Sequence, residues 1–266
     1  MSNFVSRLLV TVIGLPLVLG FAWLGGWWLF VLAAGVGLFA LHEYYAMIRP
    51  LRPIALAGHL GLLLTLLAAQ AGGFPWIVGG FATTFALAFL LKGVAETRQS
   101  ATVAVGGTVL GVAWIGLGLV SILVLRDLPV HGRLAVFTVL LAVFANETFA
   151  FLVGRLVGRH KLAPRISPGK TWEGFVAGTL ATVFVAFVAL YDQRDEFLSI
   201  GQAILLGLTM AAAAPLGDLF ESMLKRDMGV KDSGRALAGH GGMLDRIDSL
   251  LFASIAAFYV ILAFTT

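Results

Sequence analysis

The chain has 266 residues, of which 59% are hydrophobic and only 12% are charged, and its mean hydropathy is +0.97. A soluble domain carries roughly 25% charged residues, so this composition excludes an ordinary soluble protein and predicts an integral membrane protein. The formal net charge is +4, and the absence of cysteine excludes disulfides, thiolate catalysis and cysteine-bound zinc.

Nine apolar stretches follow one another along the chain, and most are about as long as a transmembrane helix, which needs about 20 residues. The first resembles a signal peptide, but no small-x-small cleavage site follows it, so we interpret it as a retained span. The break at Gly25-Gly26 and the short first and last stretches also leave eight or ten spans open. The nine stretches are residues 8–24, 27–46, 54–71, 74–91, 102–125, 134–154, 173–191, 201–221 and 249–264.

The basic residues of the connecting loops predict the orientation. With nine spans, ten basic residues outside the polar stretch at 222–248 fall on one side and only three on the other. By the positive-inside rule, the N-terminus and the polar stretch lie in the cytoplasm. The ten are Arg7, Arg49, Arg52, Lys92, Arg98, Arg155, Arg159, Lys161, Arg165 and Lys170; the three are Arg126, Arg133 and Arg194.

We predict an all-α polytopic membrane protein with about nine transmembrane helices, a polar cavity that faces the cytoplasm, and one domain over residues 1–266. Residues 1–100 supply the N-terminal helices, and residues 101–266 carry two polar segments on the same face, 155–172 and 222–248. Two acids fall within apolar stretches. Glu147 follows Asn146 in the sixth stretch, where a buried acid needs a partner or a function. For Glu43 we favour an interfacial or helix-pairing role.

The first polar segment contains Gly169-Lys170-Thr171, which suggests a P-loop. That interpretation fails because a P-loop needs glycine where this chain has Pro164, and because no strand is predicted before it. Ser167, Lys170 and Thr171 can still bind phosphate. The alternative is a basic cytoplasmic loop without a catalytic role.

The second polar segment begins at the end of the eighth apolar stretch. Eleven of the chain's 32 charged residues lie between Asp218 and Asp248, and charges beside hydrocarbon usually mark a working site. At helical spacing, Asp218 and Ser222 share a face with Lys225 or Arg226. Glu221 and Lys225 are also four residues apart, and the alternative for this pair is a surface salt bridge.

Asp245 and Asp248 are three residues apart before the last apolar stretch, so on a helix their carboxylates point the same way. With Asp218, they could form a hard-oxygen site for Mg²⁺. The alternative is capping of the last helix, which fits Asp248 better than Asp245. The preceding Gly239-His240-Gly241-Gly242 permits positive φ and a close approach to phosphate.

Together these residues resemble the phosphatidate cytidylyltransferase family, also called CDP-diacylglycerol synthase. The long signature of the family is matched by residues at the corresponding spacings, and its second hallmark by Ser167 to Gly174. The resemblance covers most of the chain. The matching residues of the signature are Ser222, Lys225, Arg226, Lys231, Asp232, Gly234, His240, Gly241, Gly242, Asp245, Arg246 and Asp248.

The resemblance implies that CTP and phosphatidate react to give CDP-diacylglycerol and pyrophosphate for phospholipid synthesis. It implies Mg²⁺ on Asp218, Asp245 and Asp248, with K⁺ as a second cation. The catalytic set is Asp218, Lys225, Asp232, His240, Asp245 and Arg246. The substrate-binding set is Ser167, Lys170, Thr171, Ser222, Arg226, Lys231, Gly241 and Gly242, with Asn146, Glu147 and Glu221 as additional candidates.

The resemblance further implies a homodimer among membrane lipids, and we expect no nucleic-acid partner. A multi-pass location in a bacterial inner membrane, with the active site facing the cytoplasm, is also expected. Two positions depart from the family: Ala238 replaces proline or glycine, and Glu147 replaces aspartate. These departures leave open a catalytically impaired scaffold.

Two further alternatives belong to other classes of membrane protein. A secondary transporter suits intramembrane acids and glycine-rich helices, but it predicts inverted repeats and a midplane site. A CDP-alcohol phosphotransferase would need an Asp-Gly-x-x-Ala-Arg run, which this sequence lacks.

Overall fold

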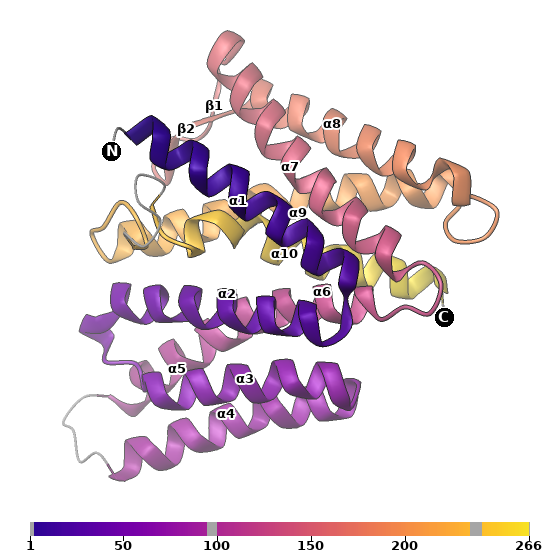
Figure 1. Cartoon of the computed structure of the whole chain (residues 1–266). Helices are drawn as coiled ribbons and strands as arrows, with labels where there is room; N and C mark the ends of the chain where they lie inside the picture. The colour runs from indigo at the N-terminus through magenta and orange to yellow at the C-terminus, as the bar shows by residue number, and fades with distance from the viewer. Residues whose placement is uncertain (1–2, 95–99, 235–240, 266) are drawn as a thin grey trace. The chain divides into compact units, whose positions relative to one another are not determined.

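The computed structural model describes residues 3–94, 100–234 and 241–265, and this part of the chain is almost entirely helical (Figure 1). Each of the nine apolar stretches coincides with helical structure there. Among the described residues, seven helices are long and apolar enough to cross a membrane, and Gly14–Leu24 and Ala55–Ala71 are shorter apolar helices. The predicted all-α polytopic membrane class is therefore confirmed. The chain divides into two compact units, 1–127 with 228–246 and 128–227 with 247–266.

The first unit contains the N-terminal helices and the second half of the polar stretch. Its elements are α1 (Asn3–Leu24), α2 (Gly26–Met47), the 3₁₀ turn η1 (Arg49–Leu51), α3 (Ala55–Ala71), α4 (Phe74–Val94), α5 (Ala101–Gly111), the π-helical turn η2 (Val112–Gly116) and α6 (Leu117–Arg126).

Small residues allow α3 and α4 to lie side by side in this unit (Figure 1). A Cβ atom at Gly80 would lie 2.8 Å from the Cα atom of Thr65, so only glycine permits this approach. The buried hydroxyls of Thr65 and Thr84 donate to the carbonyls of Gly61 and Gly80 in their own helices, at 2.7 and 3.2 Å. The helices thus pack closely without leaving these hydroxyls unsatisfied.

The turn from α1 to α2 is held by a basic side chain from α6. Arg126 donates from Nε to the carbonyl of Ala22 and from Nη2 to that of Trp23, both at 2.8 Å. These carbonyls belong to the last turn of α1, where no intrahelical donor remains. Gly25 has φ of 68°, and a Cβ atom there would meet the Arg126 guanidinium at 2.6 Å. The short break at Gly25-Gly26 is therefore a real helix boundary.

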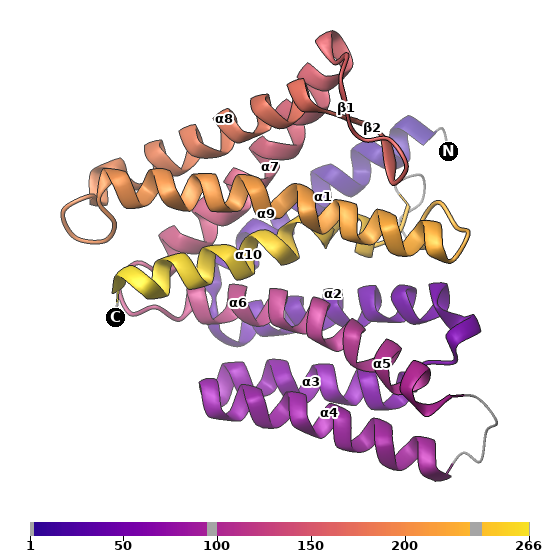
Figure 2. The ribbon, with the colours of Figure 1, turned by 180° about the vertical axis from the view of Figure 1, so that it is seen from behind.

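The second unit contains α7 (Gly132–Val157), the strands β1 (Lys161–Ala163) and β2 (Ser167–Thr171), α8 (Trp172–Leu190), the 3₁₀ turn η3 (Tyr191–Gln193) and α9 (Ile200–Asp227). It also takes α10 (Leu244–Thr265) from Ile247 onward. Figure 2 shows α8 and α9 side by side. They approach closely at Gly207, where a Cβ atom would lie 2.7 Å from the Cα atom of Val183.

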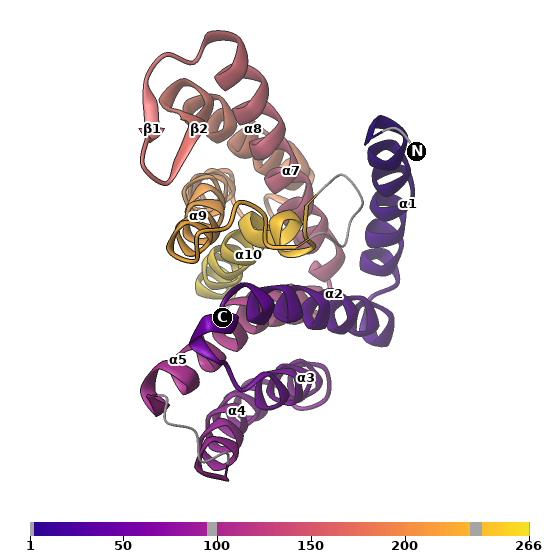
Figure 3. The same ribbon diagram turned by 90° about the vertical axis from the view of Figure 1, so that its left-hand side faces the viewer.

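The two strands form an antiparallel hairpin that the sequence did not predict, beside the start of α8 (Figure 3). Lys161 pairs with Thr171 and Ala163 with Ser167, with an irregularity between them. Thr171 ends the hairpin and begins the helix, because its Oγ1 accepts a hydrogen bond from the Gly174 backbone N–H at 3.2 Å. This side-chain cap sets where β2 becomes α8.

Candidate active site

The first polar segment meets helix α9 in the second unit through one ion pair. Lys170 on β2 places Nζ 2.8 Å from Oδ2 of Asp218 on α9, and the two side chains are 22% and 36% exposed. Nζ also lies 3.5 Å from the Pro215 carbonyl, one turn earlier on α9. The hairpin thus places the ammonium group of Lys170 beside Asp218, the first of the predicted metal ligands.

The last turns of α9 carry a row of polar side chains. Ser222 donates from Oγ to Oδ1 of Asp218 at 3.2 Å, which confirms that these residues share a face. Arg226 donates from Nε to the Ile166 carbonyl at 3.4 Å, close to the start of β2. Predicted phosphate-binding groups from both polar segments therefore lie along the same stretch of α9.

Glu221 and Lys225 form the ion pair suggested by their spacing, with 3.1 Å between Nζ and Oε2. It is not a surface pair, because the Glu221 side chain is 1% exposed and that of Lys225 is 13% exposed. A buried carboxylate needs such a partner to offset the loss of hydration. The surface alternative for this pair is therefore wrong.

Asp248 lies buried on α10, at a close contact with α9. A Cβ atom at Gly217 would collide with the Asp248 carbonyl, so glycine is required for this contact. The Oδ1 atom of Asp248 accepts from the Ser249 N–H at 2.7 Å. The negative charges of Asp218, Glu221 and Glu147 all act on this carboxylate. Acids on α7, α9 and α10 thus act on one another here, and two of them, Asp218 and Glu221, are paired with Lys170 and Lys225.

In the sixth apolar stretch, the structure buries Asn146 and leaves Glu147 exposed. Asn146 is buried in α7 and donates from Nδ2 to Oγ1 of Thr182 on α8 at 2.9 Å, so its amide joins two helices. Glu147 is exposed rather than buried. The expectation of a buried acid at 147 is wrong, because neighbouring residues on a helix point about 100° apart and Asn146 takes the inward position.

Asp245 organises the signature segment in the first unit. Its Oδ2 atom accepts hydrogen bonds from the backbone N–H of Gly242 at 2.7 Å and of Ser233 at 3.2 Å. Gly241 has φ of 79°, and a Cβ atom there would meet the same Oδ2 at 2.7 Å. The glycines thus have a structural reason besides the predicted approach to phosphate. Asp245 and Asp248 both lie in the first two turns of α10, as expected.

Several other predicted residues of this segment lie at the surface or outside the described residues. Lys231, Asp232 and Arg246 are exposed. His240 lies outside the described residues, as do Arg235 and Ala238. Sequence reasoning missed one participant: Glu43 on α2 is 4% exposed, and its Oε2 accepts from the Leu244 backbone N–H at 2.9 Å. An acid within an apolar stretch was the available signal.

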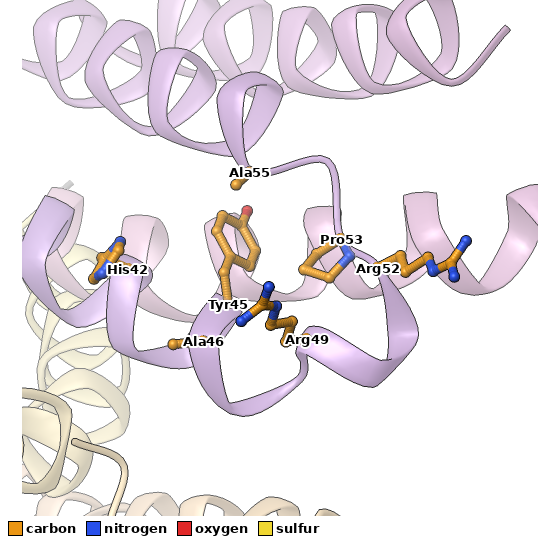
Figure 4. A pocket seen from close by; sticks show the side chains of 7 residues that line it. All are labelled: His42, Tyr45, Ala46, Arg49, Arg52, Pro53 and Ala55. Carbon is orange, nitrogen blue, oxygen red and sulfur yellow. The ribbon is translucent and has the colours of Figure 1, made fainter. Parts of the chain in front are cut away.

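A pocket of about 680 Å³ opens at the turn from α2 to α3 (Figure 4). None of the predicted site residues is among those that line it. Arg49 points toward Tyr45 and Pro53, whereas Arg52 points away from the other labelled residues (Figure 4). The two guanidinium groups therefore do not converge on one anion, and we assign the pocket no role.

The donor chemistry of the second unit fits the Mg²⁺ that the family resemblance implies. Asp218 and Asp248 supply carboxylate oxygens, the ligands that hard divalent cations prefer. Among the described residues, no three His, Asp or Glu side chains are grouped closely enough to hold a metal ion by themselves. Such a site suits Mg²⁺, which commonly takes one or two carboxylates and completes its shell with substrate phosphates and water.

Comparison with known proteins now joins these features to a family. A model of the cytidylyltransferase family matches residues 5–264. The chain belongs to this family. The matched residues include both polar segments and the helices that carry Glu43, Asp218 and Asp248.

Of three named relatives of the family, two align along nearly the whole chain and one along about half of it. A phosphatidate cytidylyltransferase of Staphylococcus haemolyticus (strain JCSC1435) is 35% identical over 251 residues, which cover 92% of this chain and 94% of the relative. The enzyme of the same name from Staphylococcus aureus (strain COL) is 35% identical over 253 residues, with the same coverage. One from Haemophilus influenzae is 42% identical over 128 residues, 47% of this chain and 44% of the relative.

Proposed function

We propose that this protein is a phosphatidate cytidylyltransferase, which makes CDP-diacylglycerol and pyrophosphate from CTP and phosphatidate. The observation that carries the proposal is the 35% identity to enzymes of that name over 92% of the chain. The comparisons lend no support to a transporter or to a phosphotransferase. The pair of Lys170 and Asp218 adds a physical reason, because it places a cation and a metal-binding acid where phosphate chemistry can use both.

The reaction is a substitution at the α-phosphorus of CTP. An oxygen of the phosphatidate phosphate forms the new bond to phosphorus, and the bond between the α-phosphorus and the bridging oxygen breaks, so pyrophosphate leaves with that electron pair. The attacking phosphate is already anionic and needs little help from a base. Positioning and neutralisation of charge are therefore the main tasks of the protein.

The basic side chains of the polar segments suit those tasks. Lys170 and Arg226, from the hairpin and the end of α9, would bind phosphate oxygens, with Ser167, Thr171 and Ser222 as further donors. Lys225 is committed to Glu221 within the site, so we assign it charge balance as well as substrate contact. Lys231, His240 and Arg246 of the signature complete the proposed set, with Asp232.

Asp218 and Asp248 would hold Mg²⁺, with Asp245 as the third predicted ligand on the same helix as Asp248. When bound, the metal would supply positive charge to the phosphates of CTP. The acids that act on Asp248 support a cation there, and K⁺ as a second cation remains part of the proposal.

We also propose that the polar segments face the cytoplasm of a bacterial inner membrane, where CTP is available, and that the protein is a homodimer within the lipid bilayer. The chain has no cysteine, so single cysteines can report the topology without background. Gln193→Cys should react with an impermeant maleimide added outside intact cells, and Arg159→Cys only after the cells are broken. Labelling in the opposite order would overturn the orientation, and cross-linking in membranes would test the dimer.

The function is tested with purified protein, labelled CTP, phosphatidate and Mg²⁺. We expect labelled CDP-diacylglycerol only when all three components are present, and loss of product in Asp218→Asn. Release of pyrophosphate without phosphatidate would indicate hydrolysis instead. A folded protein that makes no product would support the alternative of an impaired scaffold.

A further inference from the structure

Glu43 joins the membrane helix α2 to the signature segment within the first unit. It is 4% exposed, although it stands in an apolar helix where a charge is costly. Its Oε2 accepts from the Leu244 N–H at 2.9 Å and lies 3.5 Å from the Ser233 hydroxyl. Both donors come from the segment that carries the signature, about 190 to 200 residues further along the chain.

The contact with Leu244 acts as a helix cap supplied by another helix. Leu244 is the first residue of α10, and the first N–H groups of a helix lack intrahelical acceptors. Glu43 offers one of them a carboxylate oxygen, and negative charge is favourable at that end of a helix. The hydrogen bond to Glu43 therefore fixes the backbone directly before Asp245.

The carboxylates of Glu43 and Asp245 contact the same two short segments, one at Ser233 and one at residues 242–244. Ser233 gives its N–H to Asp245 and directs its hydroxyl at Glu43. Gly242 gives its N–H to Asp245, and Leu244, two residues later, gives its N–H to Glu43. The orientation of the Asp245 carboxylate is thus coupled to Glu43 through both sides of the loop.

At two glycines of this segment, a larger residue would collide with the Glu43 side chain. A Cβ atom at Gly234 would collide with its carboxylate, and all three of the nearest atoms would belong to Glu43. A Cβ atom at Gly242 would collide with the Ser233 hydroxyl and with the same carboxylate. Glycine at 234 is therefore explained by Glu43 alone.

We propose that Glu43 is a positioning residue of the active site, which holds the segment of Ser233, Gly242 and Leu244 so that Asp245 is correctly oriented. Glu43 would act through these residues and would not touch the substrate. A helix-pairing residue would stabilise α2 without setting the order of this loop. The role in catalysis rests on the proposed function, whereas the ordering of the loop does not.

Hydrogen exchange measures the ordering directly, in the full-length protein in detergent without substrates. In Glu43→Ala we expect faster deuterium uptake in a peptide covering residues 241–250, because the Leu244 N–H loses its acceptor. Tyr44→Phe is the matched control, since the Tyr44 hydroxyl lies on the same helix but donates to the Gly107 carbonyl at 3.1 Å. Uptake in 241–250 that is the same in Glu43→Ala and Tyr44→Phe would overturn the proposal.

Activity and metal dependence give the second arm. We expect Glu43→Ala to lower kcat about 100-fold, a size typical of lost preorganisation, and to raise the Mg²⁺ concentration for half-maximal rate. Glu43→Gln, which keeps an oxygen for Leu244, should recover most of the rate. If the wild type makes no CDP-diacylglycerol, the proposed function fails and the exchange result still stands. If Glu43→Ala exchanges faster but reacts like Tyr44→Phe, the positioning role is wrong.

A pair of substitutions covers the case in which Glu43→Ala folds poorly. Gly234→Ala alone should accelerate exchange at 241–250, because its methyl group displaces the Glu43 carboxylate. Glu43→Ala added to Gly234→Ala removes the collision, so the double variant should be no worse than Glu43→Ala alone. Fully additive damage in the double variant would contradict the contact on which the proposal depends.

Discussion

Lys170 and Asp218 form an ion pair of 2.8 Å between the β2 strand and helix α9, and this pair joins the first polar segment to the helix that leads into the second. The side chains are 22% and 36% exposed, so the pair is accessible to an incoming phosphate. In the absence of substrate, the lysine balances the charge of this acid. The pair therefore links charge balance in the resting protein to phosphate binding.

Replacing Lys170 should impair catalysis far more than folding. Lys170→Met removes the cation next to Asp218, and we expect kcat/KM to fall about 100-fold or more, as is typical when an electrostatic contact to a developing charge is lost. Initial rates with varied CTP and phosphatidate measure the effect. Lys161→Met, the same substitution on β1 of the hairpin, is the control and should stay within about threefold of the wild type, given the modest effects of exposed charges. Equal losses in both variants would reduce Lys170 to a general part of the basic loop.

Removing Lys225 should destabilise the protein. Lys225→Met leaves the buried Glu221 carboxylate without its cation, at a cost of about 3–5 kcal/mol for a broken buried pair. Thermal unfolding in detergent measures the loss. The double variant Lys225→Met with Glu221→Leu removes both charges and should recover much of the stability. Asp195→Asn breaks an exposed pair with Arg194 and should change little. A Lys225→Met protein as stable as the wild type would contradict the burial of the pair.

Metal removal should affect stability through Asp248. Burial deprives this carboxylate of water and three other acids act on it, so Asp248→Asn should raise the unfolding temperature of the metal-free protein. Added Mg²⁺ should stabilise the wild type, by about 2.7 kcal/mol at 100 times its Kd, and should stabilise Asp248→Asn much less. The exposed Asp192→Asn on η3 serves as the control. Equal stabilisation of all three proteins by Mg²⁺ would exclude Asp248 from the metal site.

Asp245→Asn should abolish product formation and leave the protein folded. Asparagine keeps one carbonyl oxygen, which can still accept from Gly242 and Ser233, but it loses the negative charge that a metal needs. Product formation and the unfolding temperature are measured on the same sample. Near-normal turnover would show that Asp245 serves the loop alone.

Glu147→Asp, which restores the usual family residue, should retain or raise the activity. Glu147 is exposed on α7 and its charge acts on Asp248, so a shorter acid keeps the charge in place. Turnover at several Mg²⁺ concentrations is the measurement. Complete loss of activity would mean that the surroundings have adapted to the longer side chain.

The sequence by itself determined the class of the protein and most of its helices. Apolar runs of about 20 residues have few alternatives to membrane helices, because the backbone must satisfy its own hydrogen bonds in lipid. Helical periodicity likewise predicted that Asp218, Ser222 and Lys225 lie on one face of a helix. The β1–β2 hairpin could not be predicted, since Ser167 to Thr171 contains proline and glycine and shows no alternation of apolar residues.

Only the tertiary structure decided which polar groups meet. Lys170 and Asp218 are 48 residues apart, and Glu43 and Leu244 are 201 apart, so no local pattern could pair them. Burial also depends on neighbouring elements: it makes Glu221 an interior partner of Lys225 and leaves Glu147 exposed. A helical pattern specifies which residues share a face, but packing against other elements decides what that face contacts.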